Sequence, residues 1–166
     1  KKHTCGLGQN GEIYCWGRSV DGQLGNGDIN DVSPDPDGDT MTKAQPSPVK
    51  VDFDNAELGM RGVAPKAPYK AVAAGQQHTC ALDNAGLIFC WGNNNRKQAG
   101  PNCEYEGDDG MGMNPMPKTY TKCRYPSRVP FDLTSKQLSA GGVHNCVIAA
   151  ESEGYCWGKG TAGELG

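Results

Sequence analysis

Apolar and polar positions alternate over short stretches of this chain, and the same alternation returns three times. In residues 3–16, larger side chains alternate with small or polar ones on both sides of a Gly-Gln-Asn-Gly sequence. This composition is typical of two short antiparallel strands joined by a tight turn. Folded about that turn, the hairpin sets Cys5 opposite Cys15 and Leu7 opposite Ile13.

Three copies of this unit occur at residues 3–25, 78–100 and 144–166, each 23 residues long and without a gap. The distance between copies varies while the unit does not, which indicates a repeat architecture with variable connections. Every histidine and every tryptophan of the chain occupies a matching position in these copies: His3, His78, His144, Trp16, Trp91 and Trp157. Symmetric recurrence favours a structural role over catalysis or metal binding, with the tryptophans packed between neighbouring repeats.

The eight cysteines follow the same repeat. Each copy carries two of them, ten positions apart and opposed across the hairpin, within the range of a disulfide. The remaining two, Cys103 and Cys123, bracket one insert. We therefore expect four disulfides and an oxidising compartment, the alternative being reduced thiols in a cytosolic protein. The expected pairs are Cys5–Cys15, Cys80–Cys90, Cys103–Cys123 and Cys146–Cys156.

Further strands flank the hairpins. Residues 69–77 and 136–143 share a pattern and precede the second and third copies. Pro46 to Val51 and Ser127 to Leu133 also read as strands, one before each complete repeat. The sequence thus predicts an all-β fold with four strands per unit, as in the blade of a β-propeller.

The motifs Asp21–Gly27, Val72–Gly75, His78–Leu82 and Cys90–Gly92 resemble the repeat of the chromosome-condensation-regulator propellers. The match is closest to the cysteine-bearing versions found in secreted and surface proteins. This resemblance implies antiparallel four-stranded blades in a seven-bladed ring, with residues 1–166 forming one partial propeller of about two and a half blades. We interpret the chain as a fragment of a longer protein, the alternative being copies that assemble into a ring or a fibre. Expressed alone, the chain is not expected to behave as a stable monomer, because the uncovered apolar faces and unpaired strand edges of its outer blades would associate with other molecules.

Composition narrows the function. The net charge is −3 and no cluster of Lys and Arg is visible, which argues against nucleic acid as a partner. The apolar stretches are far shorter than the ~20 residues that span a membrane. No signal peptide is visible, so we infer that it was removed or that the sequence is an internal piece.

Two inserts carry the candidate binding chemistry, residues 28–48 and 93–126. In the first, Asp35, Asp37 and Asp39 alternate around a glycine and are candidate calcium ligands, although the alternative is a solvated turn. We expect at most one weakly bound calcium there, and no other cofactor. The second insert combines an acidic run with tyrosines and methionines, so it either binds a partner or packs on its own propeller.

No arrangement typical of an enzyme is present in the sequence. The leading hypothesis is therefore a non-catalytic extracellular propeller module that binds a protein or builds a surface structure or filament. The alternative is an inhibitor or regulator that binds an enzyme through its loop face. The partner is expected to be a protein or further copies or blades of the same protein.

Overall fold

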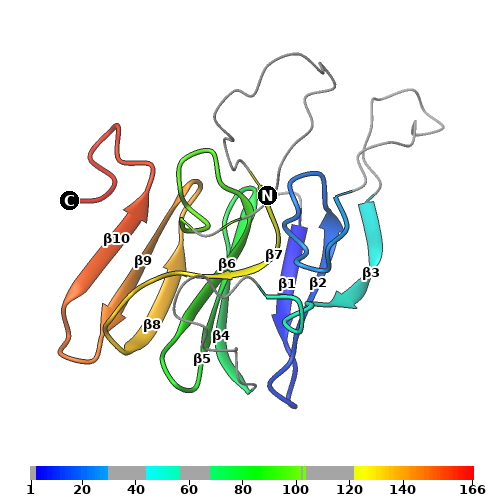
Figure 1. The fold of residues 1–166 in the computed structure, drawn as a ribbon, viewed down its shortest axis with the longest axis horizontal. Coiled ribbons are helices and arrows are strands. Elements are labelled where there is room, and N and C mark those ends of the chain that lie inside the picture. Colours follow the sequence, from blue (N-terminus) through cyan, green and yellow to red (C-terminus); the bar gives the residue numbers. More distant parts are fainter. Residues whose placement is uncertain (1–2, 30–43, 57–67, 102, 104–121) are drawn as a thin grey trace.

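The computed structural model describes residues 3–29, 44–56, 68–101, 103 and 122–166 (Figure 1). All regular structure in these residues is β. The strands are β1 (His3–Leu7), β2 (Ile13–Arg18), β3 (Ala44–Lys50), β4 (Tyr69–Ala74), β5 (His78–Asp83), β6 (Ile88–Asn93), β7 (Lys122–Arg128), β8 (Ser135–Ala140), β9 (His144–Ala149) and β10 (Gly154–Gly158).

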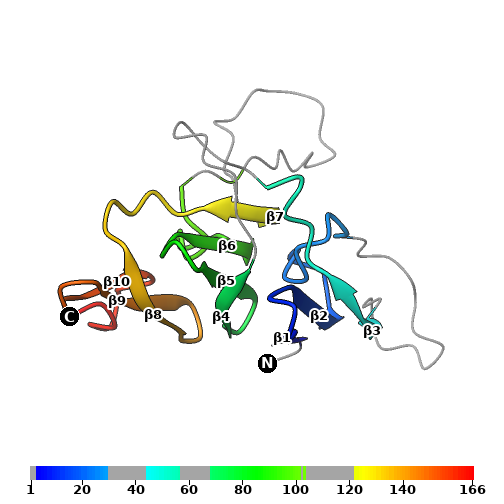
Figure 2. The ribbon, with the colours of Figure 1, turned by 90° about the horizontal axis from the view of Figure 1, so that it is seen from below.

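The strands form three antiparallel sheets that stand side by side (Figures 1 and 2). Blade 1 has the strand order β1-β2-β3, and blade 3 has the order β10-β9-β8. Blade 2, between them, has four strands in the order β4-β5-β6-β7. The middle sheet therefore has the four-stranded blade that the sequence predicted, and the sheets on either side contain three strands each within the described residues.

The hairpins have the predicted register. In blade 1, Cys5 faces Cys15 and Leu7 faces Ile13 across β1 and β2. Cys80 faces Cys90 in the same way across β5 and β6. This register follows from the turn chemistry and from the alternation of apolar positions, because a slip by one residue would move the buried side chains to the wrong face.

The fourth strand of blade 2 begins nearer the N-terminus than the sequence predicted. The prediction of a strand from Ser127 to Leu133 is wrong, because β7 ends at Arg128 and begins at Lys122, inside the predicted insert 93–126. The pairing of β7 with β6 explains the error. The register shifts between Cys90 and Gly92, so that a strict alternation is lost along β7.

The outer strand of blade 1 has the same irregularity. In the pairing of β3 with β2, the register shifts between Cys15 and Gly17. β3 includes Pro46 and Pro48, which have no N–H to give to the ladder, and prolines occur in strands mainly at such bulges and edges. β3 spans Ala44–Lys50, so the predicted strand 46–51 is displaced only slightly, and the insert ends before Pro48.

The hydrophobic core lies within and between the sheets, and blade 2 is its centre. Every residue of β5 and β6 is buried. The largest apolar side chains that are less than 2% exposed come from both the first and the second blade: Ile13, Leu24, Leu82, Ile88, Phe89 and Trp91. The core thus holds neighbouring blades together as well as the strands of each blade.

The hairpin tips of blades 1 and 2 are each joined to the first strand of the next blade. The backbone N–H of Tyr69 donates to the carbonyl of Gly11 at 2.9 Å, and that of Ser135 donates to the carbonyl of Gly86 at 3.1 Å. Gly11 has a φ of 76°, and a Cβ there would lie 2.1 Å from the Cβ of Pro68. Only glycine combines that turn with so close an approach of the next blade.

Candidate functional site

The predicted structural histidines lie at the junctions between blades. At the first junction, Nε2 of His3 lies 2.8 Å from Oγ1 of Thr79 in blade 2. The Thr79 hydroxyl donates in turn to the carbonyl of Gln23 at 2.9 Å. Since the hydroxyl hydrogen is used in that bond, its oxygen accepts and the imidazole of His3 donates.

The second junction repeats this contact with an amide in place of the hydroxyl. Nε2 of His78 lies 2.8 Å from Oδ1 of Asn145, and Nδ2 of Asn145 donates to the carbonyl of Gln98 at 2.7 Å. Burial lowers the pKa of His78, although its bond to Asn145 acts in the opposite direction. His78 is therefore a neutral donor near pH 7. His144 occupies the matching position in blade 3 and is half-buried.

The tryptophans also connect blades. Nε1 of Trp91 donates to the carbonyl of Gln23 at 2.9 Å, and Nε1 of Trp157 donates to the carbonyl of Gln98 at 3.1 Å. The carbonyl of Gln23 thus accepts from both Thr79 and Trp91 at the first junction. The carbonyl of Gln98 accepts from both Asn145 and Trp157 at the second. Trp91 is fully buried, whereas Trp16 and Trp157 are half-buried.

All eight cysteines form disulfides, in the pairs that the spacing predicted. The three hairpin pairs, Cys5–Cys15, Cys80–Cys90 and Cys146–Cys156, have Cα–Cα distances of 4.1, 4.0 and 4.1 Å. Cys103 and Cys123 are joined with their Cα atoms 5.0 Å apart. Each disulfide lies within one blade or its own connection, so none of them ties two blades together.

The candidate calcium ligands Asp35, Asp37 and Asp39 lie outside the described residues, and the calcium hypothesis stays a prediction. Within the described ranges, no three His, Cys, Asp or Glu side chains gather in a way that could hold a metal ion. The same ranges contain no helix that is long and apolar enough to cross a membrane.

The two inserts start from equivalent places in neighbouring blades, because each lies between the second strand of the hairpin and the outer strand of the sheet. These are β2 and β3 in blade 1, and β6 and β7 in blade 2. The bases of the two inserts contact each other. The N–H of Gly27 donates to the carbonyl of Arg124 at 3.2 Å, and Nζ of Lys122 donates to the carbonyl of Val20 at 2.9 Å. Hydrogen bonds therefore join the segments that flank the two inserts, one in blade 1 and the other in blade 2.

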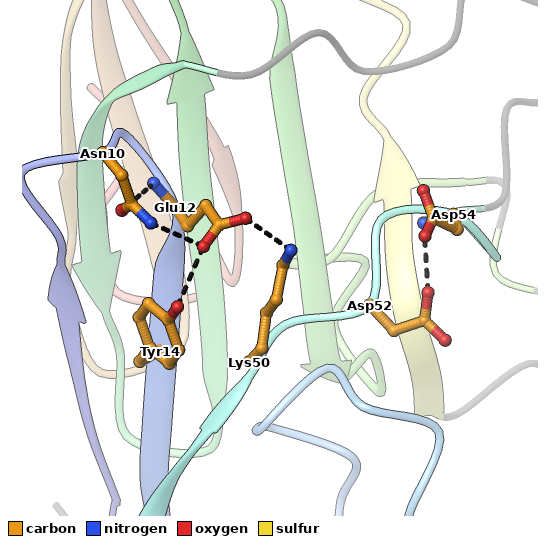
Figure 3. Close-up of polar contacts among 6 residues, drawn as sticks. All are labelled: Asn10, Glu12, Tyr14, Lys50, Asp52 and Asp54. Carbon is orange, nitrogen blue, oxygen red and sulfur yellow. Dashed lines mark hydrogen bonds and ion pairs between the residues drawn. The ribbon is translucent and has the colours of Figure 1, made fainter.

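A polar cluster lies on the outer rim of blade 1, at the end of its hairpin (Figure 3). The carboxylate of Glu12 accepts from Nζ of Lys50 at 2.5 Å, from the hydroxyl of Tyr14 at 2.9 Å and from Nδ2 of Asn10 at 2.6 Å. The bond to Lys50 is the largest cause that lowers the pKa of Glu12, and the same bond raises the pKa of Lys50. Glu12 is thus an ionised carboxylate surrounded by donors.

A small pocket of about 130 Å³ adjoins this cluster at the first junction. The rings of Phe53 and Tyr69, which line it, are stacked with their centroids 4.1 Å apart. Tyr69 is only 5% exposed, and burial raises the pKa of its hydroxyl far above the ordinary value. The other lining residues are Glu12, Ile13, Lys50, Val51 and Asp54.

The sequence reasoning missed this pocket, although one signal for it existed. Residues 51–54 read Val-Asp-Phe-Asp, and residues 129–132 read Val-Pro-Phe-Asp. Both segments follow an outer strand and supply a phenylalanine to a junction. At the second junction Phe131 contacts Tyr155, with centroids 5.0 Å apart, and a pocket of about 300 Å³ lies between Phe131 and Trp157.

Sheets of this topology, standing side by side with repeated contacts, are blades of a β-propeller. Solved propellers share the fold. Prp20p from Saccharomyces cerevisiae has a TM-score of 0.65 at 19% identity, and human WBSCR16 has a TM-score of 0.64 at 22% identity. They match 99% and 95% of this chain, which covers 33% and 31% of theirs.

The chain belongs to the RCC1-like repeat family. It matches the family described as Regulator of chromosome condensation (RCC1) repeat over residues 10–82 and again over 69–98, together more than half of its length. Among curated proteins, it is 31% identical to the RCC1 domain-containing protein RUG3, mitochondrial, of Arabidopsis thaliana, and 26% identical to the Ultraviolet-B receptor UVR8 of the same plant. Each match covers 99% of this chain but only 30% and 29% of the relative, so the chain spans less than a third of their length.

Some solved propellers of this family bind proteins. One solved structure holds yeast RCC1 bound to Kap60, and Prp20p was crystallised in a study of its binding to Gsp1p and histones. The family assignment therefore supports the coarse functional class that the sequence suggested. The number of blades in the complete ring, the partner and the compartment of this chain stay predictions.

Proposed function

We propose that this chain is part of a non-catalytic, extracellular propeller that binds another protein through the side on which the two inserts begin. The observation that carries the proposal is the contact between the insert roots, Gly27 with Arg124 and Val20 with Lys122. Long connections on a rigid scaffold are where binding residues concentrate, and two of them rooted side by side give one continuous surface. The recurring His and Trp side chains hold blades together.

The disulfides support the extracellular part of the proposal. With all eight cysteines paired, the chain is suited to an oxidising compartment, because cytosolic thiols are kept reduced. Alkylation of the protein from its native source, before and after reduction, tests this. We expect alkylated cysteines only after reduction, and thiols that are alkylated without reduction would contradict the proposed compartment.

Exchange of the insert tests the binding surface. Residues 104–121 are replaced by a Gly/Ser linker of equal length in the full-length protein, which keeps Cys103 and Cys123. As a matched control, the hairpin turn Glu151–Glu153 of blade 3 is replaced in the same way. Cross-linking and quantitative mass spectrometry on the cell surface should show partners that the insert exchange removes and the control retains, with unchanged melting temperatures. Partners retained by both variants would contradict the proposal.

Assembly into a surface structure and inhibition of an enzyme remain two forms of this proposal. Partners that are copies of the same protein would favour assembly, whereas a single enzyme among the partners would favour inhibition.

A further inference from the structure

We propose that the pocket at the first blade junction, lined by Asp54, Phe53 and Tyr69, binds an alkylammonium or alkylguanidinium group, such as a Lys or Arg side chain of a protein partner. The role in partner binding rests on the proposed function, whereas the chemistry of the pocket stands by itself.

Glu12 is not available to a ligand, because its carboxylate is already satisfied. One oxygen accepts from Lys50, and the other accepts from Tyr14 and Asn10 (Figure 3). Lys50 in turn is held on Glu12 at 2.5 Å, so the positive charge nearest to the pocket is already matched by a negative one. Because the charges of Glu12 and Lys50 offset each other, the remaining acidic residue determines the net charge of the pocket.

That remaining acid is Asp54. Its backbone N–H donates to the carboxylate of Asp52 at 3.0 Å, which fixes the turn that carries it. Its own carboxylate accepts no hydrogen bond from the described part of the chain, and the residue is exposed at the pocket. With the two carboxylates of Glu12 and Asp54 and the one ammonium group of Lys50 among its lining residues, the pocket has a net negative charge.

Tyr69 gives the second, independent observation. The residue as a whole is only 5% exposed, but its hydroxyl oxygen is not among the described polar atoms that are cut off from solvent without a partner. Because this oxygen forms no hydrogen bond with any described residue, its lone pairs can accept a hydrogen bond from a ligand donor. A cationic N–H group donates both to this oxygen and to the Asp54 carboxylate.

The walls of the pocket select for a cation as well. Phe53 and Tyr69 stack against each other at its side, and aromatic rings attract ammonium and guanidinium groups. A volume of about 130 Å³ corresponds to about four water molecules, which accommodates a charged head group with a few methylenes. An anionic ligand would be repelled by the charge of Asp54 and by the partial negative charge on the faces of the aromatic rings.

The second junction shows that the feature is specific. Ser135 stands where the first junction has Tyr69, and Phe131 contacts Tyr155. Asp132 matches Asp54 in the sequence and therefore offers a control at a site without the stacked pair of rings.

Titration of the full-length protein with small probes, followed by NMR, tests the site without any protein partner. The probes are N-acetyl-lysine methylamide and N-acetyl-arginine methylamide, with the neutral N-acetyl-norleucine methylamide as a control. We expect both cations to bind at least about fivefold more tightly than the neutral probe, as for an exposed ion pair. Equal affinity for the neutral probe would overturn the proposal.

Variants locate the binding. Asp54→Asn should weaken both cations by about fivefold, while Asp132→Asn leaves them unchanged. Tyr69→Phe should weaken the binding of both cations by about threefold, because the acceptor is lost.

Lys50→Gln should tighten the binding of both cations by a few-fold, because it exposes the charge of Glu12. A purely structural role of the cluster would not produce that gain. Equal effects of the Asp54 and Asp132 variants would overturn the assignment. Probe binding without an effect on partner capture would leave the pocket in place and contradict only its role in the proposed function.

Discussion

The two junctions between blades have the same polar contacts and different aromatic packing. At each, the imidazole of a histidine bonds to a polar side chain of the following blade, Thr79 at the first junction and Asn145 at the second. At each, a tryptophan also donates to a backbone carbonyl of the preceding blade. At the first junction Phe53 contacts three rings, those of Tyr69, Phe89 and Trp91. At the second, Phe131 contacts Tyr155, and Trp157 remains half-buried beside a pocket.

A single position outside the repeated unit accounts for much of this difference. The first strand of blade 2 begins with Tyr69, and the first strand of blade 3 begins with Ser135, and each residue is anchored to the preceding hairpin by the same backbone bond. A tyrosine at this point supplies the ring on which Phe53 stacks. The repeated unit therefore fixes how blades align, while the connections between units decide how tightly the space between them is filled.

The largest expected effect contrasts the two tryptophans. Trp91→Ala should lower the free energy of unfolding by about 3–5 kcal/mol, because a fully buried ring and its hydrogen bond are lost. Trp157→Ala should cost clearly less, because that side chain is half-buried. Urea unfolding of both variants measures the difference, and equal shifts of the midpoint would show that the junctions are equally packed.

Tyr69→Ser transfers the second junction's residue to the first. We expect a loss of about 2–4 kcal/mol through the cavity left beside Phe53. Trp91 should also become accessible, which acrylamide quenching of its fluorescence would detect in a background where Trp16, Trp157 and every other tryptophan of the full-length protein are replaced by Phe. If Trp91 stays as protected from acrylamide as in the unsubstituted protein, then Tyr69 does not exclude solvent from the first junction.

His78→Ala tests the polar contact that both junctions share. It leaves the buried amide oxygen of Asn145 without the imidazole donor and should destabilise the protein by about 1–3 kcal/mol. His3→Ala removes the matching bond to Thr79 and should have an effect of the same order. Thermal unfolding compares the two variants. A negligible loss of stability in either one would mean that its histidine hydrogen bond aligns the blades without stabilising them.

The same histidine gives a pH dependence. Because burial lowers the pKa of His78 in the folded protein, the unfolded chain takes up the proton first as the solution is acidified. Its contribution to stability is thus complete above the ordinary histidine pKa of about 6.5 and is lost as the pH falls below that value. Between pH 7 and 5, the unfolding free energy of the His78→Ala variant should decrease less steeply than that of the unsubstituted protein. Parallel curves would contradict this.

The smallest expected effect lies on the rim. Lys50→Gln removes the partner of Glu12, but the Lys50 side chain is 61% exposed, so we expect no measurable change in the unfolding midpoint. The pKa of Glu12 should rise towards its ordinary value, since the bond to Lys50 is the largest cause of its lowering. An NMR titration of the Glu12 side chain measures this, and an unmoved pKa would show that Tyr14 and Asn10 suffice.

The features that are predictable from the sequence are local. Strand pairing within a hairpin joins residues a few positions apart, so turn composition and alternation are enough to place Cys5 opposite Cys15. The bounds of the outer strand β7 do not follow in this way, because it pairs with a bulge and contains Pro126, which breaks the alternation on which the prediction relies.

The candidate site is less accessible to such reasoning. Thr79 and Asn145 differ in chemistry but accept the same histidine bond, and their partners lie 76 and 67 positions away in the chain. Likewise, no local pattern shows that Phe53 stacks on Tyr69 across a stretch of intervening chain. These contacts depend on how blades stand next to each other, which only the three-dimensional arrangement reveals.

The placement of the disulfides has a mechanical consequence. Each one closes a loop inside a blade or its connection, so no disulfide resists the parting of neighbouring blades. Under a pulling force, the blades can detach one after another, each as a separate yielding event. The residues enclosed between Cys5 and Cys15, and between the matching pairs, cannot contribute to the lengthening of the chain. A stretched molecule would thus extend only through the segments that no disulfide encloses, and each hairpin would remain ready to dock again when the load is released.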